Sequence, residues 1–262
     1  MNVLSTQSLR RVMAIARCDW LGFHRQGAWA GGASAVAAAG SLAALGVRGD
    51  AEGGLALLEL TMLLTSVGGA LLALVLGSQV VAREWRDRTW MIVLARPVSR
   101  GEFLAGKFVG VALVLGEVAL AATILVLALM LCGAPWVPLA PWLCLALWAK
   151  WCLAAALAVL FACLTSGTLA LLYASTLYVL GHAGGLVRTF AESEVHLSLF
   201  NHWGGLLFYH LLPHFEVFEH RLGSLGAGWD WARFGATLGY AAALGTAWLA
   251  LAHLAWEGRE LS

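Results

Sequence analysis

Six apolar segments, each about as long as a membrane span, restrict what this chain can fold into. They cover residues 27–46, 55–81, 108–131, 142–164, 168–187 and 234–256, and the first is built mostly from Ala, Gly and Ser. A helix crosses the roughly 30 Å hydrocarbon layer in about 20 residues, and none of the segments alternates as a membrane β-strand does. The sequence therefore predicts an all-α membrane protein with six transmembrane helices in one domain, residues 1–262.

Composition supports the membrane class. The chain is 61% hydrophobic and 12% charged, with a mean hydropathy of +0.80, whereas soluble domains have about 25% charged residues. Its five cysteines include no C-x-x-C pair, which favours small buried apolar side chains over a metal or disulfide site. No stretch suggests a separate soluble domain, so function must reside in the helices and their loops.

The basic residues predict the orientation in the membrane. Placing both termini in the cytoplasm puts eleven of the sixteen Lys and Arg residues on that side and four on the outer side. Cytoplasmic loops carry the excess of Lys and Arg in membrane proteins. We therefore expect both termini and residues 82–107 on the cytoplasmic side.

An amphipathic helix is expected ahead of the first span, over residues 8–25. Apolar residues recur at helical spacing, and arginines occupy the other faces. The apolar positions are Leu9, Val12, Met13, Ala16, Trp20 and Phe23. The pattern predicts an interfacial helix with its apolar side toward lipid. A helix that packs on the protein would show a similar pattern, and that alternative stays open.

Residues 188–233 form the longest connection, on the outer side. Within them 197–212 is apolar but too short for a span, and Pro213 ends it, which predicts re-entrant or interfacial helices before the last span. His210 and His214 have a spacing that could hold a metal ion on one helical face. Because Pro213 lies between them, histidines at a wet rim are favoured, and no metal site is predicted.

Small and ionisable residues within the spans predict contacts between helices. Glycines four residues apart permit close approach of helices, and they occur at Gly27/Gly31, Gly106/Gly110, Gly181/Gly185 and Gly235/Gly239. Glu117 and Lys150 are charged residues inside neighbouring spans. Because a buried charge is costly, we hypothesise that they pair across the helices, in a structural role rather than as a substrate contact.

A basic island, residues 82–107, separates the second and third spans and holds six of the sixteen basic residues. Residues 101–107 match the G-x-x-x-x-G-K spacing of a phosphate loop, but Phe108 replaces the magnesium-binding Ser or Thr and no preceding strand is evident. A nucleotide site is therefore not predicted. Residues 84–94 are instead expected to form a short polar helix that docks on a partner protein, an ordinary solvated loop being the alternative. Ser99 is expected to cap the next helix, with Glu102 in its first turn.

The island resembles the first cytoplasmic loop of ABC type-2 transporter permeases. The resemblance rests on Glu84, the pair Arg88-Thr89, the run Leu-Ala-Arg-Pro-Val-Ser-Arg at 94–100, and Gly106-Lys107. Residues 212–218 are similar to that family's Leu-Pro-Asn-x-x-x-Phe element in the external re-entrant region. Span count and loop lengths extend the resemblance over the whole chain, and the most similar group includes the nitrous-oxide-reductase maturation exporter. Arg88 and His214 depart from the family's usual Gly and Asn.

The resemblance implies a permease subunit of an ATP-driven exporter in the bacterial cytoplasmic (inner) membrane. A separate ATP-binding subunit would bind ATP and Mg, so no cofactor and no catalytic residue are expected in this chain. A second permease subunit, identical or related, would complete the path across the lipid bilayer, and no nucleic-acid partner is expected. The contact with the ATP-binding subunit is expected at Glu84, Arg86, Asp87, Arg88, Thr89, Arg96, Pro97, Ser99 and Arg100.

Two other classes of function fit the composition. One is a membrane scaffold or assembly subunit without transport, and the other is a membrane-embedded metal-dependent enzyme that uses Glu and His at the outer rim. The enzyme is the weaker alternative because the chain has no H-E-x-x-H or comparable ligand spacing. Co-purification of an ATPase whose turnover this chain stimulates would distinguish a permease from both.

Overall fold

The computed structural model describes residues 2–27, 40, 51–87, 98–132, 134, 136, 137, 139–184, 213–218 and 230–259. Within these ranges every regular element is a helix, which confirms the all-α class. The elements are α1 (Asn2–Arg25), α3 (Ala51–Asp87), α5 (Arg100–Leu131), α6 (Ala140–Leu164), α7 (Gly167–His182), the 3-10 helix η1 (Phe215–Phe218) and α10 (Trp231–Arg259).

Four of the described helices are long and apolar enough to cross a membrane. They are Gly53–Asp87, Arg100–Leu131, Pro141–Leu164 and Trp231–Glu257, and they contain the second, third, fourth and sixth predicted spans. The fifth predicted span corresponds to α7, whose 16 residues are fewer than a perpendicular crossing needs. Apart from Gly27 and Gly40, the first predicted span lies outside the described residues, as do most of residues 188–233 with their predicted re-entrant helices.

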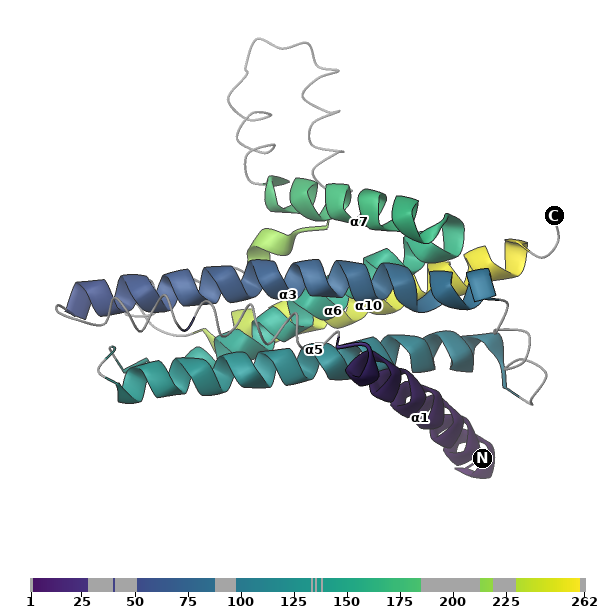
Figure 1. Ribbon diagram of the computed structural model, residues 1–262, viewed down its shortest axis with the longest axis horizontal. Helices are drawn as coiled ribbons and strands as arrows, with labels where there is room; N and C mark the ends of the chain where they lie inside the picture. Colours follow the sequence, from purple (N-terminus) through teal and green to yellow (C-terminus); the bar gives the residue numbers. More distant parts are fainter. Residues whose placement is uncertain are drawn as a thin grey trace, which may run out of the picture.

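Helix α6 lies at the centre of the bundle, between α3, α5, α7 and α10 (Figure 1). The most apolar stretch of α6 is 78% buried, whereas the most apolar stretch of α10 is 17% buried. Small side chains allow this central position, because Ala154, Ala155 and Ala158 are fully buried and let neighbouring backbones approach closely. A Cβ added at Gly77 of α3 would lie 2.6 Å from the main-chain oxygen of Ala155, so the α3–α6 crossing depends on that glycine.

Helix α1 packs along the first half of α5 (Figure 1). Its apolar stripe is only partly turned away from the bundle. Ala16 and Phe23 are buried, whereas Leu9 is 63% exposed and Met13 is 51% exposed. The predicted stripe therefore divides. Its C-terminal half contacts protein, as the packing alternative requires, and its N-terminal half remains open to a surrounding layer.

Four segments far apart in sequence meet at one end of the bundle, where α3 ends, α5 begins and α10 ends (Figure 1). Gly101 lies next to His253, because a Cβ added at Gly101 would be 3.9 Å from the His253 ring. The turn from α6 to α7, which the sequence places at residues 165–167, also lies at this end, beside Ala82. We call it the basic end. It is defined by residues 82–87, 98–107, 165–167 and 253–257.

Candidate functional site

The contact segment is residues 84–100, the predicted contact with an ATP-binding subunit. The structure describes its first four and last three residues. Glu84, Arg86 and Asp87 form the last turn of α3, while Ser99 and Arg100 start α5. Arg88, Thr89, Arg96 and Pro97 lie outside the described residues. The prediction of a separate short helix starting at Glu84 is wrong at that point, because α3 continues without a break to Asp87. Residues 80–87 contain no Gly or Pro that would stop a helix.

Ser99 caps α5 as predicted. Its Oγ accepts a hydrogen bond from the Glu102 N–H at 3.2 Å, and Glu102 Oε2 accepts one from the Ser99 N–H at 2.9 Å. This reciprocal pair is a capping box, which satisfies main-chain donors that the helix itself leaves unpaired. The 3.7 Å approach of the Arg11 guanidinium to Glu102 Oε2 also connects α1 to this turn. The start of α5 is therefore fixed both locally and against α1.

Lys107 joins three helices at the basic end. Its Nζ donates to Asp19 Oδ1 of α1 at 2.7 Å and to Glu84 Oε1 of α3 at 2.5 Å. Lys107 is only 4% exposed, and its Nζ lies 5.2 Å from the centre of the Phe103 ring. A buried ammonium is tolerated when its protons are paired in this way. The sequence identified Lys107 only as one of the island's basic residues and as part of the Gly-Lys motif, and it did not single out Asp19.

Asp19 is held in an unfavourable environment. Burial raises the pKa of its carboxyl group, against the opposing attraction of Lys107, while the nearby Glu84 carboxylate adds to the rise. Asp19 Oδ2 is buried and accepts no hydrogen bond. A carboxylate with one unsatisfied oxygen is not arranged for maximal stability.

Two glycines let α1 approach α5 closely beside Lys107. A Cβ added at Gly106 would lie 2.7 Å from Ile15 Cβ, and one at Gly110 would lie 2.9 Å from Asp19 Cβ. The predicted close approach at this pair is therefore confirmed. Within the part of the chain that the structure describes, it does not hold for Gly235 and Gly239, where an added Cβ would meet nothing within 4 Å.

An aromatic cluster adds α10 to the same end. The Trp256 ring is fully buried and lies 5.3 Å from Phe103 of α5 and 5.9 Å from Trp85 of α3, measured between ring centres. Aromatic pairs at these separations attract each other beyond the effect of their burial. The ends of α3, α5 and α10 are thus packed together directly behind the contact segment.

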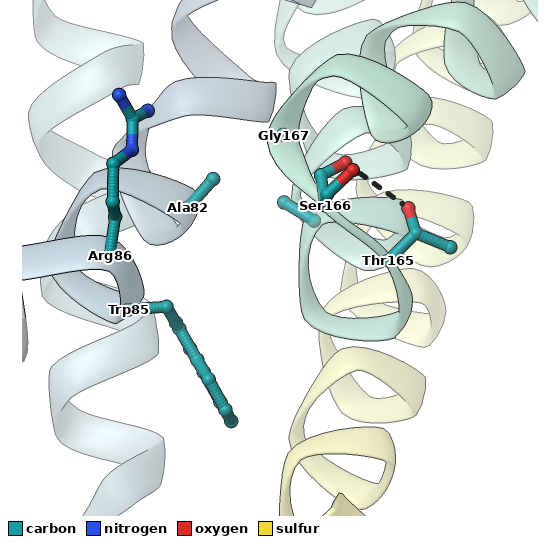
Figure 2. Close-up of a pocket in the computed structure, with 7 residues that line it drawn as sticks. Ala82, Trp85, Arg86, Thr165, Ser166 and Gly167 are labelled. Carbon is teal, nitrogen blue, oxygen red and sulfur yellow. Dashed lines mark hydrogen bonds between the residues drawn. The ribbon is translucent and has the colours of Figure 1, made fainter.

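A pocket of about 640 Å³ opens between the end of α3 and the turn from α6 to α7 (Figure 2). The side chains of Trp85 and Arg86 point in different directions from adjacent positions, and the α6–α7 turn faces them across the pocket. The lining residues are Ala82, Trp85, Arg86, Ala162, Thr165, Ser166 and Gly167. The Arg86 guanidinium and the Ser166 hydroxyl can bind a carboxylate of a partner protein, whereas the Thr165 hydroxyl donates to the main-chain oxygen of Phe161 at 2.9 Å. The α6–α7 turn is therefore part of the surface available at the basic end, and the sequence had not singled it out.

Glu117 does not pair with Lys150. Glu117 Oε1 accepts a hydrogen bond from Trp20 Nε1 at 2.6 Å, and its Oε2 lies 2.8 Å from His24 Nε2. Both partners belong to α1, which covers this face of α5. The predicted pair is therefore wrong, because the sequence could not show that α1 extends far enough along α5 to reach Glu117.

Lys150 is buried in the core and is 1% exposed. Its Nζ donates to Ser66 Oγ of α3 at 3.1 Å and lies 5.7 Å from the centre of the Tyr178 ring of α7. The neighbouring Trp151 donates to the main-chain oxygen of Ser66 at 3.0 Å and fills the space over Gly69. This environment suits the structural role predicted for Lys150, connecting α3, α6 and α7.

The element around η1, which the sequence predicts on the outer side, packs against α6 and α7 and contacts Tyr240 of α10. Phe215 and Phe218 are buried, and the Phe215 ring stacks on His182 with ring centres 5.6 Å apart. The His214 N–H donates to the Tyr240 hydroxyl at 2.9 Å. His210 lies outside the described residues. The described part of the chain contains no group of three His, Cys, Asp or Glu side chains placed to hold a metal ion.

Comparison with models of known protein families identifies the family of the chain. A family model described as "ABC-2 family transporter protein" matches residues 8–255, which is most of the chain. No curated protein matches the chain. The matched range includes most of α1, all of α3, α5 and α6, most of α10 and both ends of the contact segment. The chain therefore belongs to the ABC-2 family of transporter proteins.

Proposed function

We propose that this chain is the membrane-spanning permease subunit of an ATP-driven exporter. Membership of the ABC-2 family and the four apolar helices support a transport role in a membrane. A separate subunit binds ATP and Mg, and a second permease subunit, identical or related, completes the transport path. The membrane is the bacterial inner membrane, with both chain termini cytoplasmic. That topology is supported by the position of the N-terminal helix and the end of α10 at the basic end (Figure 1).

The contact with the ATP-binding subunit is proposed at residues 84–100, and the packing behind this segment carries the proposal. Glu84 is hydrogen-bonded to Lys107, Trp85 packs on Trp256, and Ser99 is fixed by its capping box. A force applied to the segment therefore acts on α3, α5 and α10 together. Closure of the ATP-binding subunits moves the segment, and this movement opens the interface between the two permease subunits toward the outer side.

Co-purification with an ATP-binding subunit tests the proposal. Arg86→Ala combined with Arg88→Ala is expected to weaken the complex at least tenfold, because both cations lie in the contact segment. Arg17→Ala is the matched control, since Arg17 is an exposed arginine of α1 outside the segment. If the wild-type chain binds no ATP-binding subunit when the two are co-expressed in membranes, the proposal is wrong. If the double variant binds as tightly as the control, the assigned contact is wrong.

A further inference from the structure

Lys107 couples the positions of α1, α3 and α5. Separating α1 or α3 from α5 at this site would break an ion pair of the buried Lys107 ammonium. Lys107 Nζ has two carboxylate partners, Asp19 on α1 and Glu84 on α3, at 2.7 and 2.5 Å. Breaking a buried ion pair by removing one partner is far more costly than removing the whole pair. Lys107 therefore holds α1 and α3 to α5 as one unit at the basic end.

The site also closes the base of the contact segment. Glu84 lies three residues before the end of α3, and Lys107 lies in the second turn of α5. Their hydrogen bond joins the chain just before the segment to the chain just after it. Charge-assisted bonds of this length are among the stronger hydrogen bonds in proteins. Movement of the segment is therefore transmitted to Lys107 rather than lost by fraying of either helix end.

Contacts along α1 make that helix able to follow Lys107. Gly106 and Gly110 allow it to reach the α5 backbone on both sides of Lys107, and Arg11 and Trp20 add polar contacts above and below. These contacts would position α1 on α5 without the ion pair. A stabilising role alone does not explain Asp19, whose buried Oδ2 accepts no hydrogen bond.

We propose that Lys107 is a positioning residue that transmits movement of the contact segment to α1. In this arrangement Asp19 is the carboxylate that α1 presents to Lys107, and its unsatisfied oxygen provides a second acceptor when the helices shift. The inference rests on the proposed function, because the movement originates in a bound ATP-binding subunit. It adds to that function a specific path from the contact segment to the N-terminal helix.

Hydrogen–deuterium exchange on the complex in lipid nanodiscs tests the path. Exchange is compared with the ATP-binding subunit nucleotide-free and trapped with ATP and vanadate. In the wild-type chain we expect at least a threefold change in exchange rate both in peptides covering 82–106 and in peptides covering 7–25. In Lys107→Met combined with Asp19→Asn, the change in 82–106 is retained and the change in 7–25 is lost. This double variant removes one positive and one negative charge, which avoids leaving the Asp19 carboxylate buried without its cation.

Two further variants separate transmission from stability. Lys150→Met removes the other buried lysine, outside the Lys107 site, and is expected to keep the α1 response. Asp19→Asn alone keeps Lys107 bound to Glu84 and is expected to reduce the α1 response at least twofold, so the path remains testable if the double variant does not fold. An undiminished α1 response in both Asp19 variants overturns the inference, as does a wild-type chain in which 82–106 responds and α1 does not. A wild-type chain in which neither segment responds contradicts the proposed function itself.

Discussion

Replacing two glycines by alanine should release α1 from α5. Gly106 and Gly110 face α1, and an added Cβ at each would approach Ile15 or Asp19 to less than 3.0 Å. Neither contact is a flexible side-chain end, because the atoms met are Cβ atoms fixed to the α1 backbone. The combined variant Gly106→Ala, Gly110→Ala should therefore increase the separation of the two helices.

The structure allows the magnitude to be worked out with a matched control. Overpacking costs about 1–3 kcal/mol per site, and the main-chain oxygens of Val12 and Ala16, 3.1 Å from the added atoms, allow little relief. Alanine also gains about 1 kcal/mol over glycine in a helix interior. The pair Gly235 and Gly239 has the same spacing, but a Cβ added at either would meet no atom of the described residues within 4 Å. Comparing the two double variants cancels the propensity gain and leaves a steric difference of roughly 2–6 kcal/mol.

Hydrogen exchange of the α1 amides in detergent micelles measures this difference, because α1 can open without unfolding of the whole bundle. The opening free energy over residues 7–25 should fall in the Gly106/Gly110 variant and stay unchanged in the Gly235/Gly239 variant. Equal α1 exchange in the two double variants would refute the close packing of α1 on α5 and the reasoning built on it.

Three other predictions concern the stability of the basic end. Ser99→Ala should lower the free energy of unfolding by about 1 kcal/mol, measured by titration with a denaturing detergent, whereas Ser166→Ala should change it little because the Ser166 side chain makes no capping hydrogen bond. Trp256→Ala should cost about 3–5 kcal/mol in the same titration, because a fully buried aromatic side chain is removed from its cluster. Burial raises the pKa of Asp19, so the folded chain binds more protons than the unfolded chain between about pH 4 and the raised pKa. The free energy of unfolding should therefore fall as pH rises through that window, and Asp19→Asn should remove this part of the pH dependence.

Local features of the basic end were predictable from sequence where short-range chemistry determines them. The Ser99 cap follows from a serine three residues before a glutamate at the start of an apolar run. The short α6–α7 connection was predicted at residues 165–167, and α7 begins at Gly167. Both features depend only on residues a few positions apart, for which the sequence carries the whole signal.

The pairing of ionisable residues was not predictable, because it depends on where α1 lies. Glu117 and Lys150 are charged residues in neighbouring spans, yet α1 supplies the partners of Glu117 and α3 supplies Ser66 to Lys150. Lys107 and Asp19 were missed for the same reason, since their sites are 88 residues apart. The sequence did contain one indication of the Lys107 site, because Lys107 is a single lysine near the beginning of a long apolar helix.

Glycine spacing proved an incomplete guide to helix contacts. Among the residues with a described structure, the same i, i+4 pattern marks a tight contact at Gly106/Gly110 and no contact at Gly235/Gly239. The difference arises because α10 is largely exposed while α5 is covered by α1. Gly69, which belongs to none of the predicted pairs, meets Trp151 so closely that an added Cβ would lie 2.1 Å from its ring.

The central claim is that residues 84–100 connect this chain to an ATP-hydrolysing subunit, and ATP turnover by the reconstituted complex tests it most directly. The account predicts that the wild-type chain changes the turnover of its ATP-binding subunit at least threefold relative to that subunit alone. Arg86→Ala combined with Arg88→Ala should abolish this change, whereas Arg17→Ala should preserve it. Turnover that is the same with and without the wild-type chain, or that the double variant affects as strongly as the wild type does, would contradict the account.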